Sequence, residues 1–244
     1  MHQVEQEGAS RRFALAWQAA GRHLGSLGGE GLNWLRADLD PPLAEHLSFR
    51  IGNRLFFVFV EPTDGTPPPS SKQLFLSVAA EATAIPVILK MEPALSGFRP
   101  TESDWGLRHA IDQTKVDPFL IVDDTDIPMS AWELHDFAVQ VVKGQLESSG
   151  KKILASQPSP HIDPSVWFED TNGPAFIVVR HARYPEPRAT PPANLHEIAE
   201  SCRRLSSRGY FCSVSIANAD DIEAPPLRGH GLWPKFSGLQ QIDA

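Results

Sequence analysis

Two stretches of the chain resemble each other at a fixed spacing, and this repeat constrains the fold more than any other feature. Residues 62–91 align without a gap on residues 185–214, a shift of 123 positions (185 minus 62). Proline-rich segments align first, then Ser71 with Asn194 at the start of a predicted helix, then an apolar helix face and an apolar strand. The period is longer than that of solenoid repeats. The repeat therefore predicts two related modules.

A hairpin pattern precedes each copy of the repeat. In the second half, the stretch 163–182 carries apolar runs on both sides of Asn172-Gly173, a dipeptide that accepts the positive φ of tight turns. In the first half, the apolar runs Leu47–Ile51 and Arg54–Glu61 flank Gly52-Asn53. The second run is apolar on both faces, which is typical of a central strand covered from both sides.

Amphipathic helices complete the pattern. Apolar residues recur every three or four positions over residues 9–25, and a helix over 130–148 begins with the capping box Ser130-Ala-Trp-Glu133. Shorter helices are predicted over 72–83 and after Asn194. The order of elements predicts an α/β fold (α+β, with mixed sheets) made of two tandem, pseudo-repeated α-β-β-β-α-β modules.

The first module is expected over residues 1–95 and the second over 129–221. Residues 96–128 are predicted to connect them, with one short apolar strand at Phe119–Val122, and residues 222–244 to form an irregular tail over the second module. The acidic run Asp123–Asp126 does not have the spacing of a calcium loop, so it is interpreted as a solvated turn rather than a cation site.

Composition limits the partners. The net charge of −8 and the pI of about 5.6 argue against non-specific nucleic-acid binding, so an unidentified protein partner is favoured over nucleic acid. Cys202 and Cys212 lack a CxxC spacing and are expected to be buried free thiols. Neither a signal peptide nor an apolar run of about 18 residues is visible, so a cytoplasmic location away from membranes is expected.

The order of elements over residues 130–216 resembles the restriction-endonuclease-like, or PD-(D/E)XK, superfamily. That family places an acid at the start of the second core strand and an acid-x-Lys on the third; the acids hold Mg²⁺ and the lysine assists the attacking water. By this resemblance Asp163 matches the first acid and Arg180 lies near the lysine position. Val178 stands two residues earlier, where an acid is required. Glu133 could match a helix acid found in some members.

The resemblance therefore implies a degenerate active site, with no catalytic residue, metal or cofactor expected. In the first repeat, Glu61 is followed by Pro62 and has no lysine partner. Residues two apart on a strand share a face, so a group of polar residues near the second hairpin is a candidate site for a metal or an anion. The alternative is that they are exposed polar residues near strand ends. These candidates are His161, Asp163, Arg180 and His181.

The sequence leaves three functions open. The leading hypothesis is a non-enzymatic binding or protein-interaction protein, with an apolar patch or groove at the module interface or under the tail that holds Trp233. The first alternative is a divalent-metal-dependent nuclease with a rearranged active site, its missing acid supplied by Glu169, Asp170 or Asp123–Asp126. The second is a chaperone-like protein that binds a partner. The sequence contains no GxSxG, HExxH or Walker-type motif.

Overall fold

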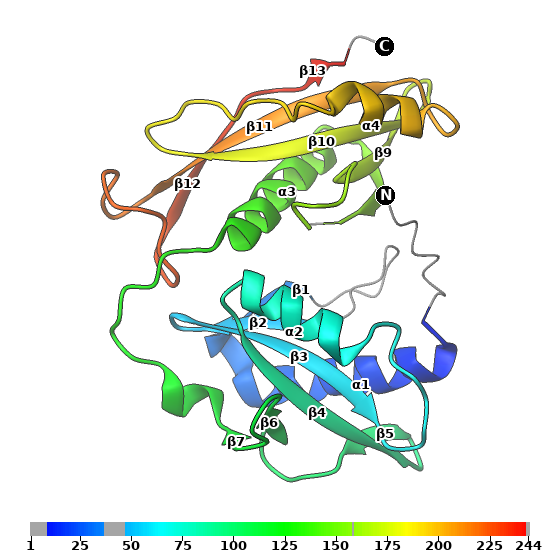
Figure 1. Cartoon of the computed structure of the whole chain (residues 1–244), viewed down its shortest axis with the longest axis vertical. Helices are drawn as coiled ribbons and strands as arrows, with labels where there is room; N and C mark the ends of the chain where they lie inside the picture. Colours follow the sequence, from blue (N-terminus) through cyan, green and yellow to red (C-terminus); the bar gives the residue numbers. More distant parts are fainter. Residues whose placement is uncertain (1–8, 37–46, 158, 243–244) are drawn as a thin grey trace. The chain divides into compact units, whose positions relative to one another are not determined.

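Each half of the chain forms a mixed sheet with one helix on either face (Figure 1). The computed structural model describes residues 9–36, 47–157 and 159–242. The chain divides into two units, Met1–Thr125 and Asp126–Ala244. The α/β class and the two tandem α-β-β-β-α-β modules predicted from the repeat are confirmed.

The first unit contains, in order, α1 (Arg11–Gly28), the 3-10 helix η1 (Gly29–Gly31), β1 (Leu32–Arg36), β2 (Leu47–Ile51), β3 (Arg54–Pro62), α2 (Lys72–Glu81), β4 (Ile85–Ala94), β5 (Gly97–Pro100), β6 (Leu107–His109), β7 (Lys115–Val116) and the 3-10 helix η2 (Pro118–Ile121). Its sheet has the order β1-β2-β3-β4-β6-β7, and β5 also pairs with β4. The pair β3–β4 is parallel and is connected through α2, whereas the other pairs are antiparallel.

The second unit contains α3 (Ala131–Ser148), β8 (Lys152–Ser156), β9 (Val166–Asp170), β10 (Gly173–Arg183), α4 (Leu195–Cys202), β11 (Gly209–Asn218), β12 (Leu232–Phe236) and β13 (Gln240–Gln241). Its sheet has the order β12-β11-β10-β9-β8, with β13 beside β11. Again one pair is parallel: β10 and β11, connected through α4.

Strand alternation divides each core into two layers. In β3, Phe56, Val58 and Val60 face α1, whereas Phe59 meets Phe75 of α2 with ring centroids 5.3 Å apart. The second unit repeats this arrangement. Ala175, Ile177 and Val179 of β10 face α3, and Phe176 and Val178 face α4. Strands β3 and β10 are therefore apolar on both faces, as predicted for the second strand of the first hairpin.

The capping predictions for α3 and α2 are confirmed. The Ser130 side chain accepts from the backbone of Glu133, whose carboxylate in turn accepts from the Ser130 backbone. The Ser71 hydroxyl accepts from the Leu74 amide at 3.1 Å. Asn194 occupies the cap position of α4 but forms no side-chain cap hydrogen bond within the described residues. Cys202 and Cys212 are buried and free, as predicted.

The repeat is not gapless in space. Ile51 pairs with Arg54 in the first hairpin and Asp170 with Gly173 in the second, an offset of 119 residues (170 minus 51). The turn is therefore Thr171-Asn172, one residue earlier than predicted. The parallel strands β4 and β11 correspond at the expected 123, because Met91 lies beside Pro62 and Val214 beside His181. The connection from strand to helix is thus four residues longer in the second unit (123 minus 119).

Several segments differ from their predicted form. Residues 97–116, expected to connect the modules, contribute β5, β6 and β7 to the first sheet, and residues 222–244, expected to be irregular, contribute β12 and β13. The predicted strand Phe119–Val122 is mostly the 3-10 helix η2, because Pro118 at its start suits a helical turn and the Asp117 side chain caps it. The helix predicted after Asn194 included Leu205 on its apolar face, but Leu205 lies beyond the end of α4 and is 71% exposed.

No helix among the described residues combines the length and the apolar character that spanning a membrane requires.

Candidate functional site

Asp163 and Arg180, two of the four predicted site residues, form a two-point ion pair. Arg180 Nη1 donates to Asp163 Oδ1 at 3.0 Å, and Nη2 donates to Oδ2 at 2.5 Å. The Asp163 side chain is 12% exposed and that of Arg180 is 21% exposed. Both oxygens of the carboxylate therefore already have a cationic donor. The acid that the resemblance assigns to a metal is neutralised by the residue near the lysine position.

The loop before β9 positions Asp163. Because β9 begins at Val166, His161 and Asp163 lie before the strand, and the premise that they share a strand face is wrong. Gln157 holds the loop from within, accepting from the Ser159 amide at 3.0 Å and donating to the Ile162 carbonyl. His161 is exposed on this loop. The loop thus brings the Asp163 carboxylate to Arg180 on β10, and His161 is not part of this ion pair.

His181 lies on the opposite side of β10 from Arg180, toward α3. Its ring meets that of His135 with centroids 6.2 Å apart. Burial lowers the pKa of His135 to about 3, helped by the nearby His181, Arg180 and His161. Burial likewise lowers the pKa of His181 to about 4, with Arg183 and Arg180 contributing. Both imidazoles are therefore neutral near pH 7. Of the four predicted residues, Asp163 and Arg180 form an ion pair and His181 meets His135, while the exposed His161 affects the pKa of His135.

Sequence reasoning missed His135. Residues Trp132 to Asp136 near the start of α3 are all buried, whereas the periodic pattern predicts a single buried face, and His135 does not fall on that face. Its contact with β10 depends on packing between elements far apart in sequence. No local pattern of apolar residues around His135 indicated that this side chain would be buried.

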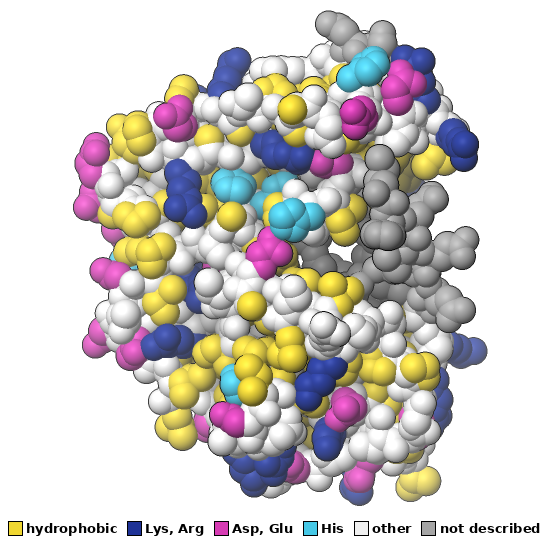
Figure 2. Space-filling view, viewed as in Figure 1, with side chains coloured by type: hydrophobic (Ala, Val, Ile, Leu, Met, Phe, Trp, Pro, Cys, Tyr) yellow, Lys and Arg dark blue, Asp and Glu magenta, His cyan; other side chains and the backbone are white. Residues whose placement is uncertain are grey.

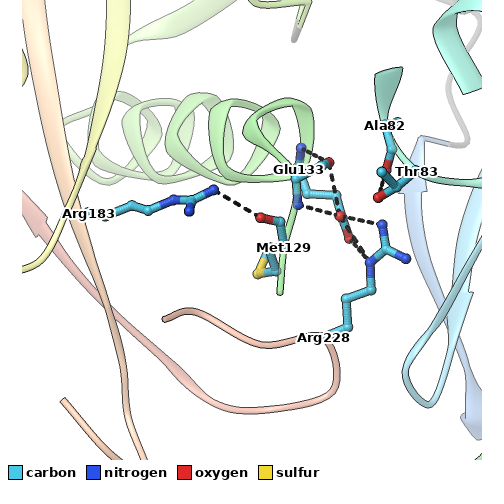
Figure 3. A network of polar contacts seen from close by, with 7 residues as sticks. Ala82, Thr83, Met129, Glu133, Arg183 and Arg228 are labelled. Carbon is cyan, nitrogen blue, oxygen red and sulfur yellow. Dashed lines mark hydrogen bonds and ion pairs between the residues drawn. The ribbon is translucent and has the colours of Figure 1, made fainter. Parts of the chain in front are cut away.

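The other positions of the nuclease pattern have structural partners. Val178 is fully buried on the α4 side of β10. Glu133 caps α3 and also accepts from Arg228, with the closest contact 2.7 Å between Nη2 and Oε2 (Figure 3). Their side chains are 0% and 4% exposed. Arg183, from the end of β10, donates to the Met129 carbonyl just before the same helix. Glu133 therefore secures the C-terminal segment to the helix.

The alternative acids are also paired or distant. Asp170 contacts Lys151 at 2.5 Å and Arg208 at 3.5 Å, and hydrogen bonding from Lys151 is the main cause of its lowered pKa. Asp170 and the exposed Glu169 lie at the far end of β9 from Asp163. The strand alone, at ~3.3 Å per residue, separates its two ends by about 13 Å. Within the described ranges, no three His, Cys, Asp or Glu side chains are grouped as metal ligands would be.

The acidic run begins as part of the first unit. Asp123 accepts from Asn53 at 2.8 Å and from Arg54 at 2.5 Å. The Asn53 hydrogen bond, with help from Thr125 and Arg54, lowers the pKa of Asp123 to about 2. Glu61, the corresponding acid of the first repeat, lies 3.8 Å from Lys90.

A surface pocket in the first unit was not predicted. Its volume is about 280 Å³, and it lies between the end of α1, the loop before β6, and β7. Leu27, Trp105, Leu107 and Val116 give it apolar walls. Small-molecule sites usually measure about 300–1,000 Å³. The pocket therefore has room for one or two side chains rather than for a typical cofactor. Its remaining lining includes Glu102, Asp104, Lys115 and Asp117.

An exposed apolar segment lies beside this pocket. We call residues 118–122 the apolar strap. Its exposed fractions are 48% for Phe119, 81% for Leu120, 37% for Ile121 and 36% for Val122. Phe119 contacts Trp105 of the pocket wall, with ring centroids 5.7 Å apart. The face seen in Figure 2 carries apolar side chains interspersed with charges of both signs, not a continuous basic field.

The strap is held by the hairpin of the first unit. Arg54 Nε donates to the Ile121 carbonyl at 3.0 Å. Gly52, with φ of +54°, leaves room for Val122: a Cβ at this position would lie 2.6 Å from Val122 Cγ1. Apolar side chains are thus presented to solvent on a fixed backbone. The tail residue Trp233, expected to cover a groove, is instead 61% exposed on β12.

Comparison with known families gives one match. Residues 132–242 match the model of a family described as a domain of unknown function, DUF8840. This range lies within the second unit, Asp126–Ala244. Neither the curated proteins nor the solved structures gave a match.

Proposed function

We propose that the protein is a non-enzymatic interaction protein that binds a protein partner through the apolar strap of its first unit. The observation that carries this proposal is the exposure of four consecutive apolar side chains on a short, hydrogen-bonded segment. Leu120 alone is 81% exposed. Contiguous exposed apolar surface marks interaction sites, whereas single exposed apolar residues are ordinary.

The second unit supports a role without catalysis. A phosphodiester-cleaving site of the resembled family needs carboxylates free to hold a metal. Asp163 is engaged on both oxygens by Arg180, and Val178 replaces the second acid with a buried aliphatic side chain. A degenerate nuclease-like scaffold is thus part of this proposal. The cytoplasmic location expected from the sequence is part of it too, in keeping with two buried free thiols.

The test is a selection of short peptides from a random displayed library on the immobilised full-length protein. We expect enriched peptides to bind the wild type in solution and to lose about tenfold or more in affinity when Leu120→Asp places a charge at the centre of the strap.

Leu95→Asp is the matched control, because Leu95 is fully exposed in the turn between β4 and β5 of the same unit. It should leave binding unchanged. The absence of any enriched peptide, or equal loss in both variants, would contradict the proposal. Incubation of the wild type with DNA and RNA in Mg²⁺ or Mn²⁺ should give no cleavage, and cleavage abolished by Asp163→Ala would support the nuclease alternative instead.

A further inference from the structure

We infer that the pocket beside the strap accepts an apolar side chain of a partner segment, and that lysine or arginine next to this side chain pairs with Asp104 and Asp117. This inference rests on the proposed function and specifies the chemistry of the partner. It identifies a peptide segment with an apolar anchor between basic residues.

The pocket and the strap form one continuous surface. Trp105 is 7% exposed and lies in the pocket wall, and its ring meets Phe119 of the strap edge-on. His23 Nε2 lies 3.3 Å from the Trp105 carbonyl, which fixes the loop to α1. An anchor in the pocket would therefore bring the adjoining residues of the same segment to Phe119 of the strap.

The size of the pocket favours a side chain. About 280 Å³ with apolar walls from Leu27, Trp105 and Leu107 suits one aliphatic or aromatic group. Interfaces gain most of their binding energy from such buried anchors in well-fitted pockets.

The charged residues around the pocket determine which side chains of the partner can stand next to the apolar anchor. Glu102 is already occupied, because Arg108 binds it at 2.6 Å and Lys115 at 3.5 Å. Asp104 is exposed and Asp117 is half-buried, and neither forms a salt bridge within the described part of the chain. Asp117 Oδ1 accepts a backbone hydrogen bond from the Phe119 amide at 3.0 Å. Two carboxylates are thus left to attract cationic groups, and the net charge of −8 acts in the same direction at longer range.

The experiment uses peptides from the same library selection. We expect the enriched sequences to combine one large apolar residue with neighbouring Lys or Arg. Their affinity should fall roughly three- to tenfold for the double variant Asp104→Asn/Asp117→Asn and should weaken as salt is raised. Asparagine keeps the backbone cap at position 117 and tolerates the φ of +60° at position 104, so the fold should persist.

Asp221→Asn is the control for the loss of one loop carboxylate of the Asp117 type. Asp221 accepts from the Glu223 amide at 3.0 Å in the same two-residue geometry as Asp117, but in the second unit. Leu27→Arg should block the pocket, whereas Leu15→Arg on the same helix should not; these leucines are 40% and 44% exposed.

The outcomes separate the two proposals. Peptides that lack basic residues and bind the double variant as well as the wild type, but still fail on Leu120→Asp, would overturn the inference and leave the proposed function standing. If no peptide that depends on the strap is enriched, both the inference and the proposed function are overturned. Loss of binding in Leu27→Arg and in the double variant, with both controls intact, would establish the pocket and its partner chemistry.

Discussion

At the scale of single residues, the ion pair between Asp163 and Arg180 determines how the second hairpin is interpreted. Neither side chain is free to act on a ligand while each satisfies the other. The pair instead fastens the loop before β9 to β10, because both guanidinium nitrogens that hold Asp163 belong to a residue within the central strand.

Arg180→Ala should therefore cost stability. Removing the arginine leaves a mostly buried carboxylate without its cation, and we expect the free energy of unfolding to fall by about 1–3 kcal/mol. Urea denaturation measures this loss. Arg99→Ala is the control, because its pair with Glu92 has side chains 70% and 38% exposed and should contribute no more than ~1 kcal/mol. Equal effects of the two substitutions would contradict a structural role for the pair.

The histidine pair predicts a pH dependence. The pKa values of His135 and His181 lie at about 3 and about 4 in the folded state, below the ordinary histidine pKa of 6.5. The unfolded chain therefore binds protons that the folded chain does not. The stability that the two neutral histidines contribute is fully present above about pH 6.5. As the pH falls toward 4, the free energy of unfolding decreases by up to ~1.4 kcal/mol per pH unit for each histidine.

His135→Phe tests this effect, because His135 Nε2 has no hydrogen-bond partner among the described residues and phenylalanine keeps an aromatic ring but cannot take up a proton. Urea denaturation at about pH 7 and about pH 5 should show a smaller loss of stability in this variant than in the wild type. His196→Phe, at an exposed position on α4, should keep the wild-type difference. The same loss in both variants would show that His135 does not titrate as described.

At the scale of elements, the hairpin turn at Gly52 supports the apolar strap. Gly52→Ala would impose a side chain at φ of +54° and place its Cβ 2.6 Å from Val122. We expect a loss of at least about 1–2 kcal/mol and faster hydrogen exchange over residues 118–122. Gly65→Ala provides the comparison, because φ is +83° there but no atom lies within 4 Å. Strap exchange that responds equally to both variants would mean that Gly52 does not hold it.

Local sequence patterns predicted some of these helices and strands but not others. The hairpins and α3 were predictable because their turn residues, periodicity and capping box act over a few neighbouring positions. Strands β5, β6, β7 and β13 have two to four residues, too few for a period to emerge. The apolar run at 119–122 resembled a strand, but Pro118 and Asp117 made it a helical turn.

The candidate site was predicted less well than the fold. Asp163 and Arg180 are 17 residues apart, and their contact depends on a loop that has no periodic pattern. The pocket walls come from α1, the loop before β6, and β7, so no local motif could have indicated it.

At the scale of the whole molecule, the two units have separate sheets and separate cores. In the second unit, both helices pack on its own sheet, and Arg228 returns to Glu133 of its first helix. Residues 126–244 expressed alone should therefore fold, giving near-UV circular dichroism and a cooperative urea transition.

A fragment that ends at residue 221 tests the role of the C-terminal segment. It lacks Arg228 and β12, so Glu133 would be buried without its cation, at a cost of about 3–5 kcal/mol. We expect this shorter fragment to unfold at a much lower urea concentration or to lose cooperativity. Similar transitions for both fragments would show that the segment is dispensable.

The four-residue difference between the two strand-to-helix connections has a practical use. One copy of the fold already contains a longer connection there, and lengthening a surface loop twofold costs only about 0.6 kcal/mol of closure free energy. In the first unit the connection includes Gly65, which is exposed, and a Cβ placed on it would meet no atom within 4 Å. A reporter peptide inserted at Gly65 would give the protein a spectroscopic handle while leaving the strap and the pocket unaltered.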